Sequence, residues 1–187
     1  MLDKISSFKF FIICFAILAL YIFFVMSPDS QIGAQLRSHL PADVTILDMK
    51  QSYSPVDAYA VLDKMGDGGR QDYLRNLLTI DLIFPLLYSL TMASLIMFLL
   101  SKIQLGNSLW KLLGWLPFLG AAFDLLENCS VAALIINYPQ RIDLLARAAS
   151  FFTTAKWQTI NLIMLIMLGE VIVLISLGLK RIFTERE

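Results

Sequence analysis

The chain has 187 residues, of which 58% are hydrophobic, and its mean hydropathy is +0.71. A soluble domain of this size is rarely so apolar, so the composition indicates an integral membrane protein. Lys and Arg together number 15, as do Asp and Glu, and this balance excludes a global charge bias toward nucleic acid or an acidic partner.

The first apolar run covers residues 8–26, and two basic residues, Lys4 and Lys9, lie at its N-terminal end. It is close to the length that spans a bilayer, and no clear small-x-small cleavage site follows it. We therefore predict an uncleaved signal anchor that forms the first transmembrane helix. Its phenylalanine, isoleucine and leucine side chains suit contact with lipid.

Residues 27–76 form a polar stretch that holds seven Asp residues and no Glu. This is the only part of the chain long enough to fold outside the bilayer, so we predict a small extracytoplasmic insert. Within it, residues 42–49 alternate weakly between apolar and polar side chains, which predicts a short strand.

A helix start follows inside the insert. Ser54 suits the N-cap, Pro55 suits the first helical position, and Asp57 stands three residues after the cap; together they are typical of a helix N-terminus. We expect this helix to cover residues 55–65 and to end at the glycine-rich turn 66–69. That turn lacks the preceding strand and the following Lys-Ser/Thr of a phosphate-binding loop.

Residues 70–76 are expected to run as helix straight into the second span, 77–100. Asp81, Pro85 and Tyr88 lie on one face of this span at helical spacing. Pro85 frees a backbone carbonyl, which neighbouring groups must then take up. Asp81 lies in the first turns, where the helix dipole favours a carboxylate, so an interfacial role and a functional role are both open.

The third span, 112–136, carries Asp124, Glu127 and Asn128 in its middle. A carboxylate near the bilayer centre costs roughly 2.5–3.5 kcal/mol on insertion scales, so these side chains need partners or a function. They share one helical face with small residues such as Gly120, which let helices approach closely. We therefore predict that this face points into the bundle.

The fourth span is expected at residues 157–179, but its apolar stretch begins at residue 144. As one helix, 144–179 would extend to about 50 Å, against a hydrocarbon core of about 30 Å. Either residues 142–152 lie along the outer interface, or the helix is steeply tilted or broken near residues 153–154.

Two charged residues, Lys156 and Glu170, lie on one stripe of this helix. We expect Lys156 in the outer half of the membrane, within reach of Glu127 or Asp81. Glu170 is expected near the middle or the inner half of the membrane.

Four spans place both termini on the same side of the membrane. Positive-inside reasoning favours the cytoplasm for both, because the predicted inner segments concentrate basic residues. These residues are Lys4, Lys9, Lys102, Lys111, Lys180, Arg181 and Arg186.

The fold class predicted is thus an all-α four-helix membrane bundle, and its polar residues suggest a cavity that binds a lipid-like or amphipathic small molecule. The candidate ligand-binding residues are Asp81, Tyr88, Asp124, Glu127, Asn128, Lys156 and Glu170. No metal site or cofactor is expected, because the single histidine, His39, lies in the insert and carboxylates alone do not specify a metal.

Three alternatives remain open. The first is an intramembrane lipid-modifying enzyme, in which Asp124 or Glu127 acts as general acid or base with Lys156 or Tyr88 as partner. The second is an accessory or scaffold subunit that docks a partner membrane protein through the insert. The third is a purely structural role, in which the polar residues tie the helices together. A transport conduit would require a homo-oligomer in so short a chain.

Several motifs resemble a family of uncharacterised bacterial four-helix membrane proteins. They are Tyr53-Ser54-Pro55, D-x-x-F-P-x-x-Y from Asp81, D-x-x-E-N from Asp124, and Thr154-x-Lys156-Trp157. The resemblance implies four spans, an inward-facing acidic site and a bacterial inner membrane, without an assigned activity. The architecture is also distantly similar to the emopamil-binding and sigma-2 receptor group, whose acidic residues line a sterol-binding cavity.

Overall fold

The computed structural model describes residues 5–27, 29–36, 38–39, 41–103 and 108–184. These residues form helices and connecting turns without strands, and four helices are long and apolar enough to cross a membrane. The predicted all-α, four-span class is therefore confirmed. The principal helices are α1 (Phe8–Tyr21), α2 (Gln31–Leu36), α3 (Pro55–Leu78), α4 (Ile80–Ile103), α5 (Ser108–Lys111), α6 (Leu116–Asn137) and α7 (Asp143–Thr184).

Three shorter helical segments connect these elements. A π-helical segment, η2 (Ile22–Met26), extends α1, while η3 (Leu47–Met49) and η4 (Leu112–Trp115) are single 3₁₀ turns. The strand predicted at residues 42–49 is wrong, because η3 occupies its end and the described chain offers no strand with which it could pair. Leu47 is fully buried instead.

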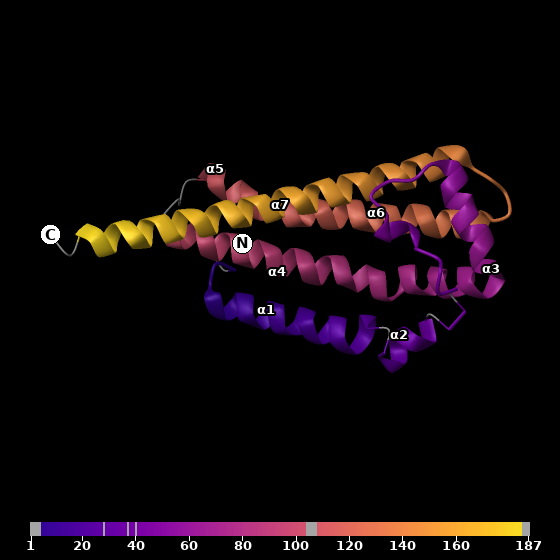
Figure 1. Ribbon diagram of the computed structural model, residues 1–187, viewed down its shortest axis with the longest axis horizontal. Coiled ribbons are helices and arrows are strands. Elements are labelled where there is room, and N and C mark those ends of the chain that lie inside the picture. Colours follow the sequence, from indigo (N-terminus) through magenta and orange to yellow (C-terminus); the bar gives the residue numbers. More distant parts are fainter. Residues whose placement is uncertain (1–4, 28, 37, 40, 104–107, 185–187) are drawn as a thin grey trace.

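In the bundle, α1, α4, α6 and α7 lie side by side, and α3 covers one end (Figure 1). Helix α6 packs against both α4 and α7, and α1 packs against α4. The start of α1 and the end of α7 lie at the opposite end from α3 (Figure 1). Of the basic residues used to predict orientation, Lys4 and Arg186 lie outside the described residues.

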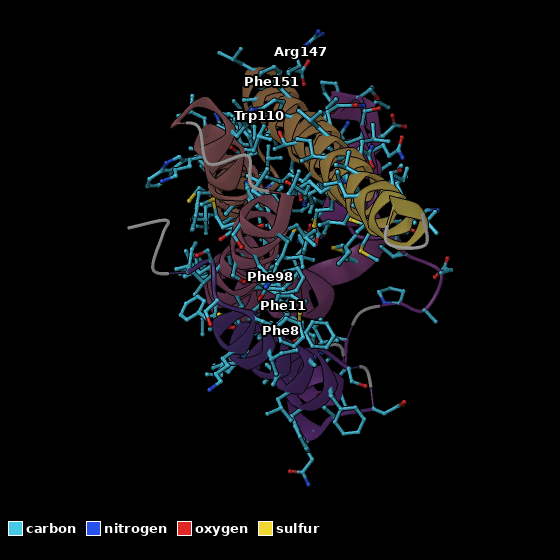
Figure 2. All side chains as sticks on the ribbon, turned by 90° about the vertical axis from the view of Figure 1, so that its left-hand side faces the viewer. Phe8, Phe11, Phe98, Trp110, Arg147 and Phe151 are labelled. Atoms are coloured by element: carbon cyan, nitrogen blue, oxygen red, sulfur yellow. The ribbon has the colours of Figure 1, made fainter. Side chains whose placement is uncertain are left out.

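A pair of phenylalanine side chains contributes to the contact between α1 and α4. Phe8, Phe11 and Phe98 lie close together in the end view of Figure 2. The ring centroids of Phe8 and Phe98 are 5.2 Å apart, within the range of favourable aromatic pairs. The rest of α1 exposes large apolar side chains, as predicted for a helix that faces lipid.

Helix α3 begins as the sequence predicts. The Ser54 side chain accepts a hydrogen bond from the backbone N–H of Asp57, and the Asp57 carboxylate accepts one from the backbone N–H of Ser54. This is a complete capping box.

The predicted end of this helix at Gly66 is confirmed, because Gly66 leaves the helical conformation, with φ 64° and ψ −179°, and kinks α3. The predicted turn does not extend to residue 69, because the helix resumes directly after Gly66. Gly68 and Gly69 remain helical and allow close packing. A Cβ atom on Gly69 would lie 3.0 Å from the carbonyl oxygen of His39. Nor does α3 run straight into the second span, because Thr79 (φ −125°, ψ −75°) separates it from α4.

Helix α7 is continuous over 42 residues, so neither a break near residues 153–154 nor an interfacial segment at 142–152 is present. Its length is about 63 Å at ~1.5 Å per residue. The Thr153 and Thr154 hydroxyls lie within hydrogen-bond distance of the backbone carbonyls of Ala149 (3.0 Å) and Ser150 (2.9 Å). Hydroxyls that lie this close to the carbonyls of the preceding turn are compatible with an unbroken helix.

Two apolar clusters form the core. The cluster at the α3 end of the bundle includes Tyr59, Leu62 and Tyr73 of α3 together with Val131 and Leu134 of α6. The second cluster joins residues of α4, such as Ile96 and Leu100, to Ile163 of α7. The buried Asp124, Glu127 and Asn128 of α6 and Lys156 of α7 stand between the two clusters in the sequence of each helix, whereas Glu170 follows Ile163.

Candidate functional site

Helix α6 presents the three polar residues of its centre on the face that is buried in the bundle. Asp124, Glu127 and Asn128 are 7%, 0% and 3% exposed. Their spacing of three and four residues places them one above the other along one helical face. The predicted inward direction of this face is confirmed.

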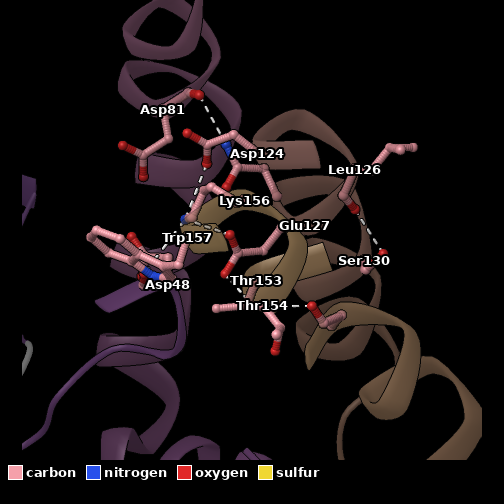
Figure 3. A network of polar contacts seen from close by, with 12 residues as sticks. Asp48, Asp81, Asp124, Leu126, Glu127, Ser130, Thr153, Thr154, Lys156 and Trp157 are labelled. Carbon is pink, nitrogen blue, oxygen red and sulfur yellow. Dashed lines mark hydrogen bonds and ion pairs between the residues drawn. The ribbon is translucent and has the colours of Figure 1, made fainter. Parts of the chain in front are cut away.

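Lys156 of α7 lies against both carboxylates (Figure 3). Its Nζ is 2.5 Å from Glu127 Oε2 and 3.3 Å from Asp124 Oδ1. The predicted proximity of Lys156 to Glu127 is therefore confirmed. We call Asp124, Glu127 and Lys156 the charged cluster. Breaking one ion pair of such a buried cluster is costly, because the remaining charge stays away from water.

Thr153 completes the environment of Glu127. Its hydroxyl donates a hydrogen bond of 2.6 Å to Glu127 Oε1, so one carboxylate oxygen is held by Thr153 and the other by Lys156. Thr153 precedes Lys156 by three residues on α7, which places both on the same helical face. This spacing could have identified Thr153 from the sequence, but the residue was missed.

A segment of the insert closes the cluster on the side of α7. We call residues 47–53 the strap. The backbone carbonyl of Asp48 lies 3.5 Å from Lys156 Nζ and accepts a hydrogen bond of 3.3 Å from Trp157 Nε1 (Figure 3). The Asp48 carboxylate accepts a hydrogen bond of 2.9 Å from the Tyr73 hydroxyl. The strap is thus anchored to both α7 and α3.

The other end of the strap is held by hydroxyls of α7. The Gln51 carbonyl accepts a hydrogen bond of 3.0 Å from Thr154, and the Tyr53 backbone N–H donates one of 2.9 Å to Ser150. The Tyr53 side chain is buried, and this burial raises the pKa of its hydroxyl. Sequence reasoning missed the strap, because these contacts join residues about a hundred positions apart.

Asn128 has a specific backbone partner on α4. Pro85 has no N–H, so the carbonyl of Asp81, four residues earlier, lacks its usual helical donor. Asn128 Nδ2 donates a hydrogen bond of 2.8 Å to this carbonyl. The expectation that a neighbour takes up the carbonyl freed by Pro85 is confirmed. The Asp81 carboxylate accepts a hydrogen bond of 2.6 Å from Asn76 Nδ2.

Tyr88 of α4 lies beside the charged cluster. Its side chain is buried, and its hydroxyl lies near enough to Asp124 to act on it electrostatically but has no hydrogen-bond partner among the described residues. Gly120 allows the helices to approach here, since a Cβ atom at this position would lie 3.4 Å from Thr159 of α7 and 3.9 Å from the Tyr88 hydroxyl. A small residue on the polar face thus serves close packing, as predicted.

Glu170 lies apart from the cluster. It follows Lys156 by about 21 Å along α7, at ~1.5 Å per residue. Its side chain is buried, and neither carboxylate oxygen has a hydrogen-bond partner among the described residues. Of the predicted site residues, the structure gathers six around α4, α6 and α7, and leaves Glu170 further along α7.

Formal charge is unbalanced at the cluster. The carboxylates of Asp48, Asp124 and Glu127 all act electrostatically on the ammonium of Lys156. Within the described ranges, no group of three or more His, Cys, Asp or Glu side chains is arranged to hold a metal ion. In the insert, His39 Nδ1 lies 3.0 Å from Asp72 Oδ2.

Comparison with known proteins adds no assignment, since no family model, no curated protein and no solved structure matches the chain. By helix length and hydropathy the protein is an integral membrane protein with four long apolar helices, and charged residues are buried among them.

Proposed function

We propose that the protein binds a lipid-like or amphipathic small molecule whose polar head group is held by Asp124 and Glu127. The observation that supports this proposal most directly is the excess of carboxylates over ammonium groups at the buried cluster. A ligand with a basic head group would balance that excess. The surrounding apolar spans would accommodate its hydrophobic part.

The energetics favour a ligand over a purely structural role. A single buried ion pair would be enough to tie α6 to α7, and polar contacts between membrane helices are worth about 0.6 kcal/mol on average. An additional buried carboxylate costs several kcal/mol if it stays charged, and otherwise it has to take up a proton. A protein more often keeps such a costly buried group where the group binds a ligand.

Entry to the cluster is proposed to occur by displacement of the strap. Two of its attachments to α7 are single hydrogen bonds, from Thr154 to the Gln51 carbonyl and from the Tyr53 N–H to Ser150. Each such bond contributes about 0.5–1.5 kcal/mol net. Releasing this end of the strap therefore breaks two hydrogen bonds, while Leu47 and Asp48 hold the other end in place.

A thermal-shift experiment tests this proposal. The purified protein in mild detergent is heated with amphiphiles that carry an amine head group, and with matched amphiphiles that carry a hydroxyl. A ligand present at 100 times its Kd adds about 2.7 kcal/mol of stability. We expect the amine series to stabilise the wild type and not the Asp124→Asn/Glu127→Gln double variant.

The control is Asp67→Asn, which removes a carboxylate whose side chain is 93% exposed and should respond as the wild type does. Equal stabilisation of the wild type and the double variant by the amine series would contradict the proposal. A large loss of stability in the double variant without any ligand effect in the wild type would favour the structural role.

Different experiments test the two other candidate functions. A lipid-modifying enzyme would use Asp124, Glu127 and Lys156, and it would form a product that disappears in Glu127→Gln. An accessory subunit would lose a co-purifying membrane protein when the helix at residues 55–65 is deleted, whereas the cluster variants would retain that protein.

For localisation we propose a bacterial inner membrane with both termini in the cytoplasm. This is supported by the resemblance to bacterial four-helix proteins and by the predicted inner clustering of basic residues. Labelling of single cysteines introduced near each terminus, in intact cells and in lysed cells, tests it. Labelling of either terminus in intact cells by a membrane-impermeant reagent would contradict the proposed orientation.

A further inference from the structure

A groove between α1 and α4 is separate from the charged cluster. It has a volume of about 700 Å³ and is lined by Phe15, Leu18, Ala19, Ile22 and Met26 on one side and by Phe84 of α4 on the other. These side chains are all apolar. The volume lies within the range of about 300–1,000 Å³ that is typical of small-molecule sites.

The groove continues into a second hollow of different character. This hollow has a volume of about 520 Å³ and shares Phe23 and Ser27 with the first. Its other lining residues include Asp29, Ser30 and Gln31. The two hollows together therefore form one amphipathic groove, apolar along α1 and polar where the chain leaves η2.

The length of the apolar part matches one leaflet of a bilayer. The distance from Phe15 to Met26 along the helix is about 17 Å at ~1.5 Å per residue. Half of the hydrocarbon core is about 15 Å. The polar part begins at Ser27, immediately after the apolar span ends. An occupant of matching shape has an acyl chain along α1 and a head group at the interface.

Charge selects the class of head group. Among the described residues that line the groove, Asp29 is the charged one, so a net anionic head group is disfavoured. We propose that this groove binds a phospholipid of the leaflet that faces the insert, with an ammonium-bearing head group beside Asp29 and a chain along Ala19. This site does not depend on the function proposed for the charged cluster.

Native mass spectrometry of the full chain tests the proposal. The protein is reconstituted in nanodiscs that contain equal amounts of phosphatidylethanolamine and phosphatidylglycerol with identical acyl chains, and retained lipids are counted after release. We expect phosphatidylethanolamine to exceed phosphatidylglycerol by about threefold, the ratio that one exposed charge contact allows. Ala19→Phe should fill the groove and remove this retained lipid. Ala16→Phe, on the same helix outside the groove lining, should keep it.

Charge reversal gives a second test that leaves the apolar span unchanged. Asp29→Lys should invert the preference toward phosphatidylglycerol, whereas Asp43→Lys, at another exposed position of the insert, should not. Equal retention of both lipids by the wild type, or an unchanged preference in Asp29→Lys, would overturn the proposal. Retention in Ala19→Phe at the level of Ala16→Phe would also overturn it. The Asp124→Asn/Glu127→Gln variant should keep this lipid, so the failure of either proposal is visible separately.

Discussion

Replacing Lys156 with methionine is the most informative single perturbation of the charged cluster. The substitution preserves most of the side-chain volume and removes the ammonium that lies 2.5 Å from Glu127 Oε2 and 3.3 Å from Asp124 Oδ1. Removing one partner of a buried ion pair costs about 3–5 kcal/mol, because the remaining charge is uncompensated. For a chain of this size that corresponds to a decrease in Tm of about 10 °C.

Thermal unfolding in detergent measures the effect, with a double-mutant cycle to assign it. Glu127→Gln in the Lys156→Met background removes one of the orphaned charges, so the double variant should lose about 1–3 kcal/mol less than the sum of the single losses. Lys102→Met, at an exposed lysine near the end of α4, is the matched control. A loss in Lys156→Met no larger than in Lys102→Met, with strictly additive cycle energies, would refute the reasoning.

Three further predictions concern single contacts. Asn128→Leu should lower the free energy of unfolding by about 1–3 kcal/mol, because it leaves the Asp81 carbonyl without a donor; a neutral result in chemical unfolding would contradict this role. Gly66→Ala should cost about 1–2 kcal/mol by the same measurement, since φ 64° is unfavourable for alanine, and unchanged stability would contradict the strain. Glu170→Gln should retain any ligand of the charged cluster, because Glu170 lies about 21 Å further along α7; loss of that ligand would show that both belong to one site.

Much of the fold follows from local sequence signals. Length and hydropathy predict the spans, and the capping box formed by Ser54 and Asp57 predicts the start of α3. The contact of Lys156 with Glu127 was predictable from helical spacing, because a lysine on an apolar helix needs a nearby acid. The role of Asn128 could also have been inferred, since Pro85 leaves a carbonyl that requires a donor.

Other features depend on contacts between distant residues and carry no local signal. The Asp48 carbonyl meets Trp157 across 109 positions, so the strap could not be predicted from the pattern of residues 42–49. Gly68 and Gly69 were predicted to end a helix. They are instead helical, and their small size is required because His39 packs against them.

The central claim is that the charged cluster holds a ligand, and mass spectrometry of small molecules and lipids that co-purify in mild detergent tests it most directly. Wild-type protein is compared with the Asp124→Asn/Glu127→Gln variant and with Asp67→Asn. We predict an amphipathic species with a basic head group that is retained by the wild type and by Asp67→Asn and is lost in the double variant. An identical set of molecules in all three proteins would contradict the claim and would make the cluster a structural tie between α6 and α7.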